Sequence, residues 1–108
     1  MSTAFVSQLR ASRPPIELGA PGTDGITVRV EASDLWDTVR VVVDPTTTVA
    51  ELKQRVVMEF FPAQGFLDDF VLKIRGWEML HEQESLSKAG VVDGSILLLA
   101  YRRRRPVR

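Results

Sequence analysis

Residues 44–61, DPTTTVAELKQRVVMEFF, constrain the fold more than any other stretch, because both ends of a helix are marked there. Thr48 is followed three residues later by Glu51. This spacing is a capping box, in which the two side chains satisfy backbone N–H groups of the first turn. A helix is therefore predicted to begin near Val49 and to end before Pro62.

Apolar residues recur along this segment at spacings of three or four, the period of a helix with one buried face. The apolar stripe consists of Val49, Leu52, Val56 and Phe60. Most charged and amide residues fall off the stripe and are expected to face water: Glu51, Lys53, Gln54, Arg55 and Glu59. The helix is therefore expected to be committed to the core and to offer little chemistry.

Alternating apolar residues predict strands before and after the helix. Residues 26–31 and 38–43 alternate apolar and polar side chains around the loop 32–37, and predict an antiparallel hairpin. Residues 70–75 predict a third strand, with Val71 and Lys73 on the opposite face from the core residues.

The segment 77–86 is predicted to be short and irregular, with Leu80 and Leu86 as its core residues. The closing strand is predicted at residues 95–101. Its unbroken run of one isoleucine and three leucines favours a central position in the sheet.

Length and composition indicate one domain with a single core, since the chain has 108 residues and is 44% hydrophobic. The sequence contains no cysteine, which excludes disulfides and cysteine-based metal sites and favours a cytoplasmic or nuclear location. We expect residues 26–101 to form the domain, 1–25 a mostly disordered leader, and 102–108 a basic tail. The leader is expected to be a plain solvated segment; the alternative is a short docking motif at IELG.

Charge is unevenly distributed although the formal net charge is zero. Residues 26–101 hold seven Lys and Arg against twelve Asp and Glu, whereas residues 102–108 carry five arginines and no acid. The domain and its tail therefore have opposite signs.

In order and spacing, these segments resemble ubiquitin and the ubiquitin-like β-grasp domains over about residues 26–102. The resemblance rests on VVVDPTTTVAELKQRV, FVLKIRG and LHEQESLSKAGVVDGSILLLAYR. It implies an α+β fold of order ββαββ, with a mixed sheet of four to five strands packed on one helix.

Proteins of this family act as modifiers joined to targets through a C-terminal Gly-Gly, or as fixed domains that bind partners. After Leu99 this sequence reads AYRRRRPVR, without Gly-Gly. The resemblance therefore implies a non-conjugated, monomeric module that binds other proteins, and ranks a covalent modifier last.

The family's partners commonly dock on an apolar patch of the sheet, and the resemblance places that patch here at Lys73, Leu98 and Ala100. Lys73 stands where ubiquitin has an isoleucine, so standard ubiquitin receptors are not expected to bind in the same manner. The neighbouring loop carries two large apolar residues, which extend the patch. The predicted protein-binding residues are Leu35, Trp36, Val71, Lys73, Leu98 and Ala100.

Trp36 and Trp77 are both expected in exposed segments, where tryptophan often anchors an interface. The alternative is that each ring folds over the domain edge and covers apolar side chains. Trp36 is the stronger candidate because its loop borders the sheet face.

The tail residues Arg102, Arg103, Arg104 and Arg105 suggest a second function, an electrostatic adaptor for nucleic acid or anionic membrane. A nuclear-import signal and a plain solvated tail are the alternatives. Only Tyr101 adjoins the arginines, so base stacking is not supported.

The sequence offers no arrangement typical of an enzyme, a metal site or a cofactor site. His81 lies near Glu82 and Glu84, but one histidine with two carboxylates is a weak ligand set, and we interpret it as a solvated surface cluster. No catalytic residue and no cofactor are predicted.

Overall fold

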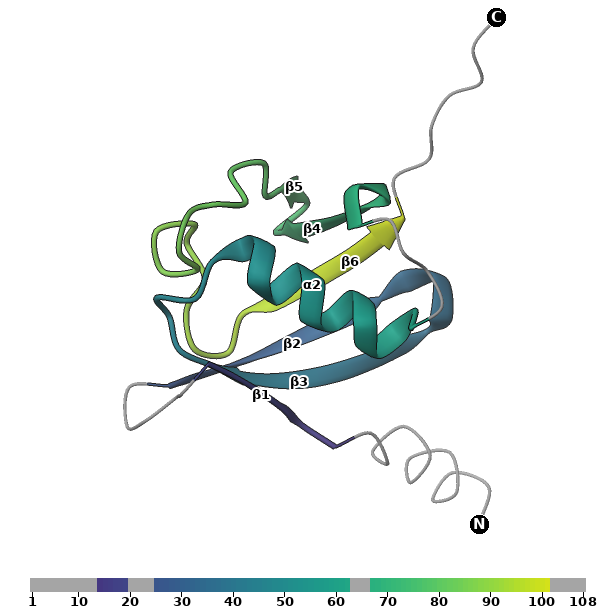
Figure 1. The fold of residues 1–108 in the computed structure, drawn as a ribbon, viewed down its shortest axis with the longest axis horizontal. Helices are drawn as coiled ribbons and strands as arrows, with labels where there is room; N and C mark the ends of the chain where they lie inside the picture. The colour runs from purple at the N-terminus through teal and green to yellow at the C-terminus, as the bar shows by residue number, and fades with distance from the viewer. Residues whose placement is uncertain (1–13, 20–24, 63–66, 102–108) are drawn as a thin grey trace, which may run out of the picture.

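The computed structural model describes residues 14–19, 25–62 and 67–101, which form one sheet and one α-helix (Figure 1). The strands are β1 (Ile16–Leu18), β2 (Ile26–Ala32), β3 (Asp37–Val43), β4 (Phe70–Ile74), β5 (Trp77–Glu78) and β6 (Ile96–Tyr101). The helix α2 spans Val49–Phe60, and two short 3₁₀ turns, η1 (Ser33–Leu35) and η2 (Leu67–Asp69), precede β3 and β4.

The capped helix forms where the sequence predicts it. The Thr48 hydroxyl accepts a hydrogen bond from the Glu51 amide at 3.1 Å, and the Glu51 carboxylate accepts one from the Thr48 amide at 3.2 Å. Helix α2 begins at Val49 and ends at Phe60, and every residue of the predicted apolar stripe is buried. The capping box and the helix limits are therefore confirmed.

The segment before the helix is ordered by Asp44. Its carboxylate oxygen accepts hydrogen bonds from the Thr46 amide at 2.8 Å and the Thr46 hydroxyl at 2.7 Å. These two hydrogen bonds hold the pKa of Asp44 below its ordinary value, and the bond from the amide has the larger effect. Their stabilising effect is present at neutral pH and is lost as the pH falls through that lowered pKa.

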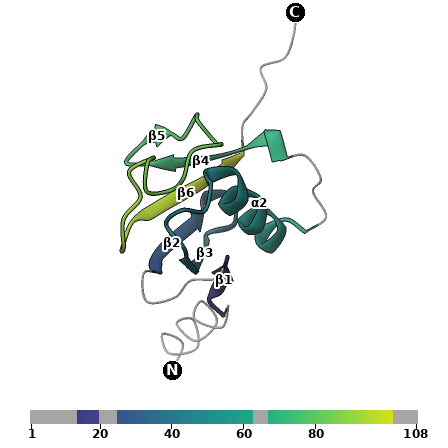
Figure 2. The ribbon, with the colours of Figure 1, turned by 60° about the vertical axis from the view of Figure 1, so that its left-hand side comes forward.

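The sheet has six strands in the order β1-β3-β2-β6-β4-β5. It is mixed, because β1 pairs with β3 and β2 pairs with β6 in parallel, while the other neighbours are antiparallel. Helix α2 covers one face, as the two views show (Figures 1 and 2). Strand β6 lies between β2 and β4, which confirms its predicted central position.

The core lies between α2 and the inner face of the sheet, the face that α2 covers. Hairpin β2–β3 places Val28 opposite Val41 and Val30 opposite Val39, and all four side chains are buried. Because side chains alternate along a strand, the residues between them point to the other face. We call the face opposite α2 the outer face.

Strand β1 lies within residues 1–25, which were expected to form a mostly disordered leader, and shows that part of this segment is ordered. Within that leader, Ile16–Leu18 pairs in parallel with β3, with Ile16 opposite Val41. Only 4% of Ile16 is exposed, and it belongs to the core cluster. The segment IELG thus packs on its own domain, while residues 1–13 and 20–24 of the leader lie outside the described residues.

Replacing Ile16 by alanine is expected to lower the free energy of unfolding by about 2 kcal/mol, because a buried side chain of the core loses three carbons. Chemical denaturation of the full chain measures this loss. Glu17→Ala, an exposed position on the same strand, is the control and should change stability by less than about 0.5 kcal/mol. Equal stability of wild type and Ile16→Ala would show that β1 is not part of the fold.

The β4–β5 hairpin corrects the core assignment in residues 77–86. Arg75 and Gly76 both have positive φ, at 52° and 83°, as a two-residue hairpin turn requires. The Met79 amide then donates to the Leu72 carbonyl at 2.8 Å, so Met79 is buried while Leu80 is 70% exposed. The prediction of Leu80 as a core residue is therefore wrong, and that of Leu86 is confirmed.

The position of Lys53 also differs from the prediction, which placed it on the solvent-exposed face of the helix. Its side chain is only 4% exposed. The ammonium group donates to the Phe70 carbonyl at 3.2 Å and pairs with the Glu82 carboxylate at 2.6 Å. The lysine stem is long enough to lie along apolar surface while its charged end reaches these oxygens, which explains why the helical period misplaced it.

Candidate protein-binding face

The outer face carries a continuous row of side chains across five strands. The strand registers align Thr38 on β3, Glu31 on β2, Leu98 on β6, Lys73 on β4 and Glu78 on β5. Leu98 and Lys73 are half-buried, and Glu31 is exposed. The row places an apolar side chain between a carboxylate and an ammonium group.

Trp36 stands at the end of the β2–β3 hairpin, beside this row. It follows η1 and adopts a left-handed backbone conformation with φ 53° and ψ 37°, and its amide donates to the Ser33 carbonyl at 3.4 Å. This conformation costs a non-glycine residue about 1 kcal/mol. The indole is 89% exposed, so the fold holds a large aromatic side chain in water at this point.

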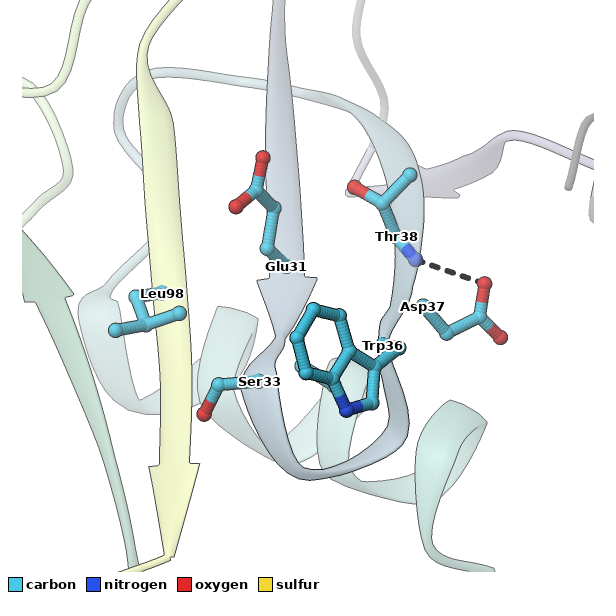
Figure 3. A pocket seen from close by; sticks show the side chains of 7 residues that line it. Glu31, Ser33, Trp36, Asp37, Thr38 and Leu98 are labelled. Carbon is cyan, nitrogen blue, oxygen red and sulfur yellow. Dashed lines mark hydrogen bonds between the residues drawn. The ribbon is translucent and has the colours of Figure 1, made fainter.

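A groove of about 440 Å³ lies on the outer face next to Trp36 (Figure 3). Its lining residues are Glu31, Ala32, Ser33, Trp36, Asp37, Thr38 and Leu98. The Asp37 carboxylate accepts a hydrogen bond from the Thr38 amide at 2.8 Å, and the Thr38 hydroxyl donates to the Val30 carbonyl at 3.2 Å. The wall formed by β3 is therefore held in place by hydrogen bonds.

The groove combines apolar and acidic surface. Trp36 and Leu98 supply apolar area, Glu31 and Asp37 supply carboxylates, and none of the described residues that line the groove is basic. An exposed indole next to carboxylates suits a side chain with an aliphatic stem and a cationic end.

The structure brings some of the predicted binding residues together and separates others. Trp36 and Leu98 share the groove, Leu35 is exposed on η1, and Lys73 lies one strand away from Leu98. Ala100 is half-buried on β6, opposite Val71 of β4.

Val71 does not contribute exposed surface as predicted, because it is only 4% exposed. Strand alternation gives the direction of a side chain but does not reveal what covers it. Five groove residues were missed by the sequence analysis: Glu31, Ala32, Ser33, Asp37 and Thr38. The hairpin register, once known, identifies Glu31 and Thr38 as a cross-strand pair.

Both tryptophans are exposed, so the alternative in which each ring covers the domain edge is wrong for Trp36 and for Trp77. Trp77 belongs to the short edge strand β5 and does not line the groove. Of the two tryptophans, Trp36 is therefore the one that lines the groove.

His81 is exposed, and Glu82 is engaged by Lys53. Among residues 14–19, 25–62 and 67–101, no three His, Asp or Glu side chains gather in a way that could hold a metal ion. In the same residues, no helix is long and apolar enough to cross a membrane. Arg102 to Arg105 lie outside the described residues, so the predicted role of the tail stays a prediction.

Comparison with solved structures shows a ubiquitin-like fold. The ubiquitin-like domain of an Arabidopsis thaliana protein matches with a TM-score of 0.63 and 19% identity, over 83% of this chain and 90% of that one. Caldiarchaeum subterraneum ubiquitin matches with a TM-score of 0.62 and 20% identity, over 76% of this chain and 99% of that one. No protein-family model and no curated protein sequence matches the chain. The α+β β-grasp prediction is confirmed, with a sheet of six strands in place of four to five.

Proposed function

We propose that this protein is a ubiquitin-like binding module that recognises partner proteins non-covalently through its outer face. The observation that carries the proposal is Trp36, which is held in a costly backbone conformation, is 89% exposed, and borders a groove that also contains Leu98. A fold gains nothing from exposing an indole in this way. Tryptophan is among the residues that contribute most to binding at protein interfaces.

The charged side chains of the outer face favour a partner different from the proteins that bind ubiquitin. Lys73 adjoins Leu98 in register, and Glu31 lies on the other side of Leu98. Charged groups on both sides of a small apolar centre favour an interface whose polar rim selects the partner. The partner is therefore expected to present an apolar side chain flanked by charges of complementary sign.

The test is affinity purification from the native cell with wild type and Leu98→Arg. The arginine places an unpaired charge at the centre of the face, and recovery of bound proteins is expected to fall by at least about tenfold. Met58→Arg is the matched control, because Met58 is exposed on α2 and α2 covers the other face of the sheet. Identical recovery with wild type and Leu98→Arg would exclude this face as the binding site.

The electrostatic adaptor remains a separate prediction, since its residues Arg102 to Arg105 lie outside the described part of the chain. Titration with RNA or acidic vesicles at low and high salt tests it, because a charge-driven contact weakens as salt rises. Monomeric state and a cytoplasmic or nuclear location are likewise part of the proposal. Size-exclusion chromatography and microscopy of the tagged protein address them.

A further inference from the structure

The charge of the outer face changes sign in the row next to Thr38, Glu31 and Leu98, on the side away from Trp36. The strand registers align Arg40 on β3, Arg29 on β2 and Ile96 on β6, and Arg75 follows at the end of β4. All three arginines and Ile96 are exposed. This row is basic, whereas the groove beside Trp36 is acidic.

Arg29 and Arg40 lie directly opposite each other in the antiparallel pair. Like charges in that position destabilise a sheet. Neither side chain has an ion pair or hydrogen bond within the described parts of the chain. The fold therefore bears a repulsion that an external anion would relieve.

Two shallow grooves adjoin these arginines and meet at Ile96 and Gly94. One, of about 190 Å³, is lined by Thr27, Val28, Arg29, Arg40, Gly94 and Ile96. The other, of about 430 Å³, is lined by Ile74, Arg75, Val92, Asp93, Gly94, Ser95 and Ile96.

The surface between the arginines is largely aliphatic. Ile96 and Val92 are each more than half exposed. Asp93 supplies the one carboxylate among the lining residues that the structure describes, and it accepts a hydrogen bond from the Thr27 amide at 2.8 Å. Asp93 is thus committed to the backbone and offsets only part of the positive charge.

We infer that these two grooves form a second docking surface, which binds an acidic peptide segment carrying at least one aliphatic side chain. Arg29, Arg40 and Arg75 would pair with its carboxylates, and Ile96 and Val92 would contact the aliphatic side chain. A peptide fits better than a nucleic acid, because the described residues that line the two grooves include no aromatic side chain to stack on bases. The inference goes beyond the proposed function and does not depend on a partner at the Trp36 groove.

The experiment measures fluorescence anisotropy of a labelled peptide made of aspartates and glutamates around a Leu-Leu pair. The matched probe has asparagine and glutamine at the acidic positions. Since the tail arginines would also attract an acidic probe, the reference protein is the full chain with Arg102 to Arg105 replaced by glutamine. We expect it to bind the acidic probe, to bind the neutral probe at least about tenfold more weakly, and to lose affinity between about 50 and about 200 mM salt.

Two variants on this reference protein locate the site. The double variant Arg29→Gln/Arg40→Gln is expected to lose about tenfold in affinity for the acidic probe. Ile96→Ser should weaken binding of the acidic probe severalfold, whereas Trp36→Ala should leave it unchanged. Removal of the like-charge pair should leave the double variant at least as stable as its parent, so unfolding does not account for lost binding.

Three results would overturn the inference. They are unchanged affinity in the double variant, equal affinity for both peptides, or tighter binding of a single-stranded oligonucleotide of matched charge. Failure of Leu98→Arg to release partners in cells would instead contradict the proposed function, since that test reads the Trp36 side of the face. The two proposals can therefore fail separately.

Discussion

Replacing Leu97 by alanine is expected to lower the free energy of unfolding by about 3 kcal/mol. Leu97 lies on the central strand β6, is fully buried, and belongs to the core under α2. Its neighbours are held by β2 on one side and β4 on the other, so they cannot collapse into the cavity. For a domain of this size the loss corresponds to a fall of roughly 15 °C in the thermal midpoint, which circular dichroism measures.

Leu98→Ala is the matched control, since it makes the same deletion at the next residue on the opposite face. Leu98 is half-buried, so the cost in stability should stay below about 1 kcal/mol while partner binding weakens. The pair thus separates a core residue from a residue of the proposed interface on one strand. Equal destabilisation by the two substitutions would contradict the assignment of inner and outer faces.

Replacing Glu82 by alanine is expected to destabilise the fold by about 2 kcal/mol at neutral pH. The substitution leaves the buried ammonium of Lys53 with one neutral acceptor, the Phe70 carbonyl. Removing one partner of a buried pair costs more than the pair contributes, because the remaining charge stays out of water. Glu82 is partly exposed, which admits some water and keeps the cost at the lower end. Urea denaturation measures the change.

Lys53→Met is the informative counterpart. It removes the buried charge, keeps an apolar stem of similar length, and leaves a Glu82 carboxylate that water can reach. We expect a cost below about 1 kcal/mol. Arg55→Gln, which breaks the more exposed pair with Glu59, should cost less than about 0.5 kcal/mol. A Lys53→Met protein as unstable as Glu82→Ala would show that the ion pair itself stabilises the fold.

The features predicted correctly from sequence are those that depend on local pattern. The capping box at Thr48 and Glu51 needs only a spacing of three. The strands β2, β3 and β4 need only alternation over five residues or more, and β6 needs only an unbroken apolar run. The apolar run of β6 also predicted its central position correctly. These signals lie within one element, so no knowledge of its neighbours is required.

The errors arise where a distant partner decides the outcome. Strand β1 has three residues, too few to show a period, and forms because β3 offers an edge. Met79 replaces Leu80 in the core because one further hydrogen bond extends the β4–β5 pairing. Lys53 is buried because Glu82 and Phe70, far along the chain, provide oxygens for its ammonium group.

The candidate site was predicted only in part, because some of its residues are brought together by strand pairing, which the sequence alone does not show. Trp36 and Leu98 could be chosen from residue type and resemblance, and they do share a groove. Glu31 and the opposed pair Arg29 and Arg40 become visible only once the hairpin register is known. Residue type and resemblance predicted a docking position, whereas the strand pairing showed which charged residues lie around that proposed position.

The place of β1 in the sheet has a consequence for the order of folding. Strand β1 precedes β2 in the chain, yet its neighbour is β3, which lies on the far side of the hairpin. Strand β1 therefore pairs across the intervening strand β2 in the chain, which makes its contacts with β3 less local than those within the β2–β3 hairpin. Being short and bonded on one side, β1 is expected to form last and to open first, with amides that exchange with solvent faster than those of β6. Reversible opening of β1 would expose the edge of β3 while the rest of the core stays closed.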